Sequence, residues 1–316
     1  MACSSDCPPT FHHIDELLEE TAALDYHGAM STSTVLNREE YIEQAYLFRV
    51  LRERIAEGLA LQEVLEQAGE EILATTRLPY AVQFLTAEVK HTGLLSSGFA
   101  RLPHYFTPFQ AFVVRCTEVE KLRFAAETAL LVLQRESEYR AGNPTSSGLF
   151  VYQFEVLCRN RLGYAEGLTA MLGDPFYAPD WREFLEMVRQ QVGLVDLAEM
   201  LFLRSEQYVN ERRRQEPDYE PPLPAVFGAK EGKIAGANRG KDPLYLFAAL
   251  QRQLNYPEVP RPKPRDDISA KLEVIQARLR ELDARLKLVE GELRGQVDLS
   301  QFGKPELLSD LPDDKE

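Results

Sequence analysis

The sequence predicts an all-α protein, and three observations lead to that prediction. Apolar residues recur at helical spacing in successive stretches between residues 37 and 214. No stretch alternates apolar and polar residues for long enough to indicate a β-strand. A heptad repeat of apolar residues runs from Ile268 to Leu293. We therefore predict a multi-helix bundle body at 37–214, a connector rich in proline and glycine, and a C-terminal coiled-coil helix.

The composition narrows the classes of protein to consider. The chain of 316 residues is 44% hydrophobic and 27% charged, which is typical of globular proteins. Its formal net charge of -14 disfavours a protein that coats nucleic acid or anionic lipid, because both require a surplus of Lys and Arg. No window approaches the roughly 20 apolar residues of a membrane span. With no secretory signal and four cysteines that fit free thiols, we expect a cytoplasmic protein.

The two ends of the chain differ from the rest. Residues 1–36 form a leader that we expect to be partly disordered, with helical spacing of apolar residues from Ile14 to Leu24. Residues 295–316 form a short acidic tail that we also expect to be disordered. The leader contains Cys3, Cys7 and a His pair, but their spacing matches no standard zinc finger, so we expect no metal there.

The body begins with three predicted helices. The first runs from Asn37 to about Ala56, with Asn37 and Glu40 spaced as a capping box. The second runs from Leu61 to Ile72, and the third begins at Pro79 and reaches Gly93.

Three longer helices are expected to follow. Pro108 opens the helix that we predict to be the longest of the body, reaching about Arg140. The next runs from Ser146 to about Leu172 and is apolar on two sides, which indicates a central position in the bundle. The last runs from Pro179 to about Arg214, with a kink or short break at Gly193.

The segment 92–114 is predicted to be an apolar, aromatic loop. Arg101 is its single charged side chain, and His104 is the only other titratable base. Such a loop either crosses the helical core and is buried, or forms a ligand or partner surface with Arg101, His104 and Tyr105 as its polar groups. The candidate binding residues are Phe99, Arg101, His104, Tyr105, Phe106 and Phe109.

A metal site is the alternative for the same bundle. Glu88 and His91 are three residues apart on one helix, as in helical di-iron carboxylate proteins. Glu120 and Glu127 lie beside the apolar stripe of the predicted long helix, and Arg123 lies between them. A ferritin-like di-metal site requires two such Glu–His pairs, whereas the sequence has one. We therefore favour an ion network of Arg123 with its two neighbours over a metal centre.

No catalytic motif is present. The sequence lacks the Gly-x-Ser-x-Gly, His-Glu-x-x-His and paired Cys-x-x-Cys patterns. Cys116 and Cys158 lie in helical patterns among apolar neighbours, where a thiol usually serves as a small buried hydrophobe. We predict no catalytic residues and no cofactor, and favour a protein that is not an enzyme.

Residues 215–265 are predicted to connect the body to the coiled coil. Prolines and glycines dominate the segment, which carries one short helix at 243–254 capped by Asp242. Four prolines between 257 and 264 predict a stiff, extended spacer.

The heptad repeat suggests how the protein works. Leucine at every a position and mostly β-branched residues at d disfavour a parallel dimer and favour a higher-order assembly. We predict a non-enzymatic scaffold or adaptor that self-associates through the helix at 266–294 and binds a protein partner with its body. The alternatives are the di-metal protein, a small-ligand-binding bundle that uses 92–114, and a helix that folds back on its own body. The predicted seam residues are Ile268, Leu272, Ile275, Leu279, Leu282, Leu286, Val289 and Leu293.

Overall fold

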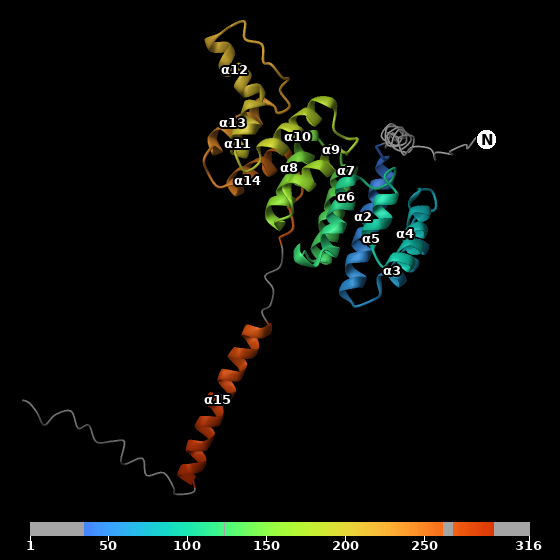
Figure 1. Cartoon of the computed structure of the whole chain (residues 1–316), viewed down its shortest axis with the longest axis vertical. Helices are drawn as coiled ribbons and strands as arrows, with labels where there is room; N and C mark the ends of the chain where they lie inside the picture. Colours follow the sequence, from blue (N-terminus) through green and yellow to red (C-terminus); the bar gives the residue numbers. More distant parts are fainter. Residues whose placement is uncertain (1–34, 123, 262–267, 294–316) are drawn as a thin grey trace, which may run out of the picture. The chain divides into compact units, whose positions relative to one another are not determined.

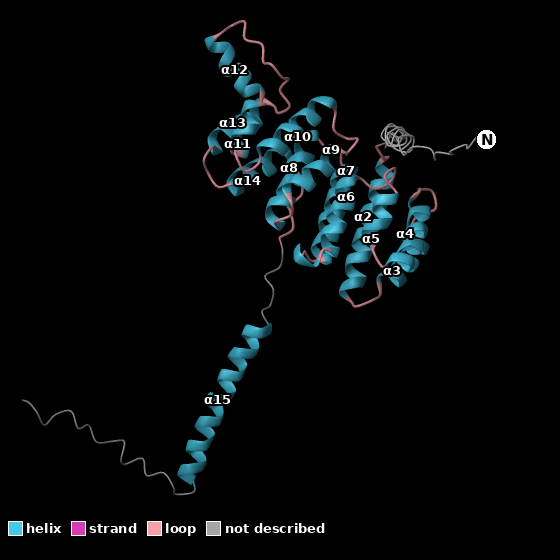
Figure 2. Ribbon diagram, in the orientation of Figure 1, coloured by secondary structure: helices cyan, strands magenta, loops and turns pink. Residues whose placement is uncertain are grey.

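The structure is a computed structural model that describes residues 35–122, 124–261 and 268–293. These residues form helices and loops without a β-strand, so the predicted all-α class and multi-helix body are confirmed (Figures 1 and 2). The chain divides into two compact units, the first ending at Pro262 and the second beginning at Lys263. Nearly all of the predicted leader and the whole acidic tail lie outside the described residues.

The first three predicted helices are confirmed. They are α2 (Arg38–Ala56), α3 (Leu61–Glu71) and α4 (Leu78–Thr92). The buried face of α2 packs along α7, and this is the most extensive helix pair in the body. α3 pairs with α4 beside it. Gly93 ends α4 in the left-handed region at φ 71°, a conformation that costs glycine little.

The predicted capping box at the start of α2 is wrong. Asn37 is the N-cap residue, but its side chain caps no backbone N–H group. The side chain of Glu40 is buried and accepts hydrogen bonds from the backbone N–H of Arg77 at 2.9 Å and from the Tyr105 hydroxyl at 2.7 Å. Tertiary partners therefore replace the local cap.

The segment 92–114 is not a loop, and this prediction is corrected. It contains α5 (Leu95–Arg101) and the first part of α6 (Pro108–Glu118). Thr107 and Gln110 form a reciprocal capping box that begins α6. Gly98 allows α5 to approach α4 closely, because a Cβ atom there would lie 2.6 Å from a methyl group of Leu85.

The predicted long helix from Pro108 to Arg140 is also wrong. α6 ends at Glu118, a 3₁₀ turn follows (Glu120–Leu122), and α7 (Ala126–Ala141) begins a separate helix. Val119 has extended backbone at ψ 102°, and the carboxylate of Glu118 instead accepts hydrogen bonds from the first backbone N–H groups of α5. The break lets α6 and α7 pack on each other.

The predicted helix 146–172 is two helices. α8 (Ser146–Asn160) ends where Arg161 takes left-handed backbone at φ 54°, and α9 (Tyr164–Leu172) turns back against it. Gly167 permits this contact, because a Cβ atom there would lie 2.5 Å from Leu157. Most of α8 is buried, which confirms its predicted central position.

Residues 179–215 form three further helices. α10 (Pro179–Gln191) is followed by a break at Gly193, which is confirmed with φ 86°. α11 (Leu197–Leu203) and α12 (Glu206–Gln215) are separated by a second break at Arg204 that the sequence did not reveal.

The predicted connector contains two helices rather than one. The short helix at 243–254 is present as α14 (Pro243–Leu254), and α13 (Ala229–Asn238) precedes it. α13 packs on α11, α12 and α14, while α14 packs on α8. Phe227, Phe247 and Tyr256 are buried in the same core as the earlier helices. These residues therefore belong to the first compact unit, which extends to Pro262.

The second compact unit contains α15 (Ile268–Leu293), a helix of 26 residues. Ile268 and Leu293 are its first and last residues. The apolar side chains between 272 and 289 are about half exposed, ranging from Leu272 at 51% to Val274 at 64%.

Candidate functional site

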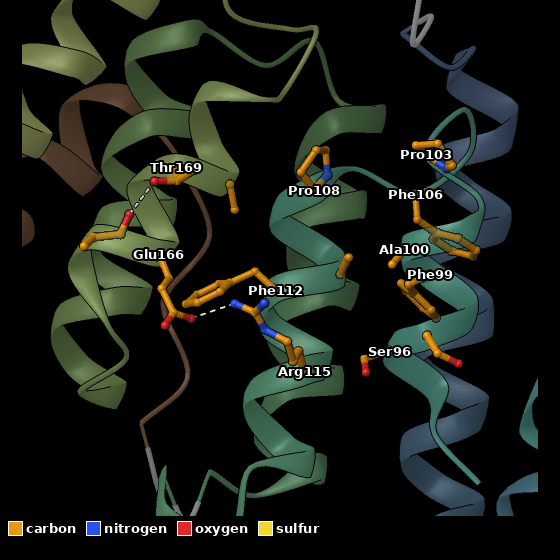
Figure 3. A pocket seen from close by; sticks show the side chains of 14 residues that line it. Ser96, Phe99, Ala100, Pro103, Phe106, Pro108, Phe112, Arg115, Glu166 and Thr169 are labelled. Atoms are coloured by element: carbon orange, nitrogen blue, oxygen red, sulfur yellow. Dashed lines mark hydrogen bonds and ion pairs between the residues drawn. The ribbon is translucent and has the colours of Figure 1, made fainter. Parts of the chain in front are cut away.

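A groove of about 730 Å³ lies between α5, α6 and α9 in the described part of the body. Figure 3 shows α6 along its middle, with α5 on one side and α9 on the other. Pro103, Phe106 and Pro108 lie toward one end of the groove, while Ser96 and Arg115 lie toward the other.

The groove is lined mainly by aromatic rings and small side chains. Phe99, Phe106 and Phe112 are almost fully buried and form the floor of the groove. The first two stack with ring centroids 3.9 Å apart, which fixes the connection between α5 and α6. Small residues on all three helices keep the walls low: Ala100, Ala111, Ala165 and Ala170. The result is a shallow apolar channel with a rigid base.

The polar groups around the groove already have partners within the protein. Arg115 on α6 forms an ion pair with Glu166 on α9 at 2.6 Å, and its guanidinium lies 5.8 Å from the ring centre of Phe112. Thr169 donates its hydroxyl to the backbone carbonyl of Ala165 at 2.7 Å. A ligand that needs many hydrogen bonds would therefore compete with internal ones. The chemistry of the groove suits an apolar surface such as one side of a helix.

Tertiary contacts hold α6 in place at the centre of the groove. The Gln110 side chain donates to the Gln44 amide oxygen on α2 at 3.2 Å, in a fully buried position. The carboxylate of Glu118 accepts from the backbone N–H groups of Leu95 at 2.7 Å and Ser96 at 2.9 Å. These bonds secure both ends of α6, so the groove is preformed.

The predicted binding residues of 92–114 are divided between several places. Phe99 and Phe106 line the groove, whereas Tyr105 and Phe109 are buried in the core. Arg101 forms an ion pair at 2.5 Å with Glu88 of α4 and lies over the ring of Phe84.

The remaining candidate, His104, is exposed and lines a different, smaller depression of about 220 Å³ with Arg77 and Tyr80. The three polar groups proposed from the sequence therefore do not line the groove. The aromatic rings of the segment are buried, as the first interpretation expects, and three of them also line the groove. A ligand or partner surface on this segment stays a prediction.

The sequence did not reveal the residues that α9 contributes to the groove. Ala165, Glu166, Thr169 and Ala170 come from a stretch read as the continuation of a single helix. Glu166 lies 51 residues beyond Arg115 in the chain. No local signal links the two, and only the reversal of the chain at Arg161 brings α9 against α6.

The residues of the alternative metal site are spread over different elements. Glu88 is buried, and its carboxylate accepts from Ser97 at 3.0 Å and from Arg101. His91 is exposed near the end of the same helix. Glu120 is exposed in the 3₁₀ turn, and Glu127 is exposed in the first turn of α7.

The expectation that Glu120 and Glu127 share one helix is therefore wrong, and Arg123 lies outside the described residues. Within the ranges that the structure describes, no group of three or more His, Cys, Asp or Glu side chains could hold a metal ion.

A second polar cluster is fully buried near the centre of the body. Arg140 forms ion pairs with Glu136 at 2.8 Å and with Asp174, and Gln153 donates to Glu136. Burial disfavours the charged guanidinium, but Asp174 and Glu136 outweigh that cost and raise the pKa of Arg140. Burial also raises the pKa of Glu136. Because the three charged side chains are almost fully buried, the cluster joins α7 to the loop before α10.

Among the described residues, no helix combines the length and apolarity needed to cross a membrane. Comparison of the chain with protein-family models, with curated proteins and with solved structures gives no match.

Proposed function

We propose that the protein is a non-enzymatic helical scaffold or adaptor that self-associates through α15 and binds a protein partner with its helical body. The observation that carries this proposal is the exposed apolar stripe of α15. Its members recur at steps of three and four residues, and each is more than half exposed: Leu272, Ile275, Leu279, Leu282, Leu286 and Val289.

The energetics favour pairing of this stripe. Each leucine or isoleucine that leaves water stabilises a packed helix by about 1.5–3 kcal/mol. Six such side chains on one helix exceed what scattered surface leucines would present, and their heptad spacing matches the seam of a coiled coil. Leucine at a with isoleucine or valine at most d positions favours three or more helices over two.

The flanking charges fit parallel pairing between chains. Arg278 and Asp283, and likewise Arg285 and Glu290, have opposite charge and the spacing of g and e positions. In the single chain, Arg285 instead bonds Glu281 at 2.6 Å, one turn earlier. This exposed pair contributes less than about 1 kcal/mol, so it can exchange for a pair between helices.

The groove on the body supports the second half of the proposal. It is apolar and preformed, and α6 lines it with residues between Pro108 and Arg115. Low walls of alanine let a helix backbone approach closely, while the aromatic floor offers contact area. A helix with one apolar side, supplied by a partner protein, matches this shape.

The thiols of the body support a non-catalytic, cytoplasmic role. Burial raises the pKa of Cys116 and of Cys158 to about 11. Both thiols are free and remain protonated at neutral pH, where a protonated thiol is a poor nucleophile.

Sedimentation of the full-length chain tests self-association. Leu279→Asp/Leu286→Asp places charges at two a positions of the seam and is expected to dissociate the assembly. Ala277→Asp/Ala284→Asp adds the same charges at exposed positions on the opposite side of α15 and should leave it intact. If the seam variant sediments as the unmodified protein does, α15 does not organise the assembly.

Affinity capture tests the groove. Ala100→Glu/Ala165→Glu introduces two carboxylates at exposed positions in the groove, and a partner helix bound there should be lost. Ala87→Glu/Ala126→Glu makes the same exchange at exposed helical positions outside the groove and should retain it. Equal recovery of the same partner by both variants contradicts the proposed binding surface.

A further inference from the structure

We propose that the surface of the body covered by residues 256–261 is a second peptide-binding site, and that these residues are its autoinhibitory occupant. The ligand that we infer is an extended segment of another protein. It carries an aromatic residue, a β-branched residue three positions later, and directly after that a residue other than proline. The groove between α5, α6 and α9 is lined by other residues, so this inference does not depend on the role proposed for it.

Residues 256–261 follow α14 as an extended segment without helix or turn. Two of its side chains are anchors buried in the body: Tyr256 is 3% exposed and Val259 is 2% exposed. Glu258 and Arg261 are exposed instead. Buried anchors three positions apart are typical of a peptide recognised in the polyproline II conformation, which repeats every three residues.

The first anchor has a specific seat on α8. The ring of Tyr256 meets the ring of Tyr152 edge-on, with the ring centroids 6.3 Å apart. Its hydroxyl donates to the carboxylate of Glu155 at 2.6 Å. This seat favours a tyrosine at the first position of a bound segment.

Two side chains of the body hold the backbone of the segment. Arg135 of α7 donates to the carbonyl of Glu258. Asn160, the last residue of α8, donates its Nδ2 to the carbonyl of Pro260 at 3.3 Å. Because every residue has a backbone carbonyl, these bonds would hold any extended segment whose anchors fit.

The side chain of Asn160 indicates that the chain's own segment is an imperfect ligand. Asn160 is 8% exposed, and its Nδ2 also donates to the carbonyl of Val156 at 3.1 Å. Its Oδ1 is buried and has no donor among the described residues. A buried acceptor without a donor costs free energy, and native proteins rarely contain one. Pro260 cannot supply the donor, because proline has no backbone N–H.

A different residue at the position of Pro260 would complete this interaction. An asparagine side chain has both a donor and an acceptor, so it can bind the carbonyl and the N–H of one residue together. The chain's own segment uses only the first of these. Its attachment to the body compensates, since a short tether gives an effective concentration of about millimolar. The segment therefore occupies the site until a ligand with the missing N–H displaces it.

Synthetic peptides test the inference on the full-length protein. The probes are two fluorescent copies of residues 254–261, one with Pro260→Ala and the other with N-methylalanine at that position. N-methylalanine lacks an N–H, and its methyl group takes the place of part of the proline ring. Fluorescence anisotropy should show that the alanine peptide binds at least about fivefold more tightly, because it alone donates to Asn160 Oδ1.

Two variants of the protein locate the effect. Asn160→Ala removes the acceptor and should make the two peptides bind equally, a result that general loss of structure would not produce. Pro260→Ala in the full-length chain gives its own segment the missing N–H, so the alanine peptide should bind about fivefold more weakly than to the unmodified protein. The groove variant Ala100→Glu/Ala165→Glu should bind both peptides as the unmodified protein does.

Three results overturn the inference. They are absence of binding by the alanine peptide, equal affinity of the two peptides for the unmodified protein, and a preference that persists in Asn160→Ala. Undiminished peptide binding by the Pro260→Ala protein also overturns it, and this variant decides the matter if Asn160→Ala does not fold.

These outcomes are separate from those of the proposed function. If the peptides do not bind but Ala100→Glu/Ala165→Glu loses a partner helix, the site at 256–261 is refuted and the adaptor proposal stands. If the peptides bind as expected and that variant retains every partner, the peptide site stands and partner binding through the groove is refuted.

Discussion

The helical body and α15 differ in how far their apolar residues are buried. In the body, aromatic and aliphatic side chains from distant helices meet in one continuous core, as where Phe150, Phe184 and Phe227 pack together. In α15 the seam leucines are more than half exposed. The body therefore contains the partners that stabilise it, whereas the apolar stripe of α15 remains more than half exposed in the described chain and, as we propose, packs against another helix. Stability of the body and assembly through α15 should respond to different mutations.

A mutation in the buried ion cluster should have the largest effect on the stability of the body. Arg140→Met leaves Glu136 and Asp174 without their cation at positions with no solvent exposure, and should reduce the free energy of unfolding by about 3–5 kcal/mol. Urea unfolding measures the loss, and sedimentation of the protein that remains folded should show assembly unchanged.

The same variant should show a characteristic pH dependence. Burial raises the pKa of Glu136, and removal of Arg140 takes away the charge that opposes this rise. A carboxyl whose pKa is raised by folding destabilises the protein more as pH rises through the unfolded value and up to the folded one. The loss in free energy of unfolding caused by Arg140→Met should thus be smaller at pH 5 than at pH 8. An equal loss at both pH values contradicts the role assigned to the cluster.

A mutation in the seam of α15 should have the next largest effect, on the free energy of self-association. Leu279→Ala removes a large apolar side chain from an a position and should weaken self-association by about 2–3 kcal/mol per buried leucine. Sedimentation equilibrium measures the dissociation constant, which should rise by roughly 30- to 150-fold. The control is urea unfolding of the body, which should be unchanged. A lower unfolding free energy with unaltered assembly would indicate that α15 packs on its own body.

A buried hydrogen bond tests a smaller contribution within the body. Burial and the bond to Glu40 raise the pKa of Tyr105, so its hydroxyl remains a donor at neutral pH. Tyr105→Phe removes this donor while keeping the ring, and should reduce the free energy of unfolding by about 1.5–2 kcal/mol. Thermal unfolding measures the change. No change would mean that the backbone N–H of Arg77 alone satisfies the Glu40 carboxylate.

The exposed ion pair at the groove should contribute least to the stability of the body. Arg115 and Glu166 are both more than half exposed, so solvent screens their attraction. Arg115→Gln should change the free energy of unfolding by less than about 1 kcal/mol, as urea unfolding can show. A loss comparable to that of Arg140→Met would contradict the distinction between buried and exposed pairs.

Helix positions with strong local signals were predictable from the sequence. Pro179 and Gly193 mark a helix start and a helix break, because proline lacks the N–H that a first turn does not use and glycine tolerates positive φ. The helix at 243–254 was predicted from Asp242, whose side chain accepts from the backbone N–H of Leu244 at 2.8 Å. These signals act within a few residues, so a single sequence contains them.

The sequence by itself therefore determined the all-α class, most helix starts and the spacing of the α15 seam. The tertiary structure decided the breaks at Val119 and Arg161, because no local residue forbids helix at either position and the gain comes from packing of the reversed chain. It likewise decided the groove, since Phe99, Phe112 and Glu166 meet only after those reversals. Periodicity specifies which side of a helix is apolar, but only the folded chain determines what that side contacts.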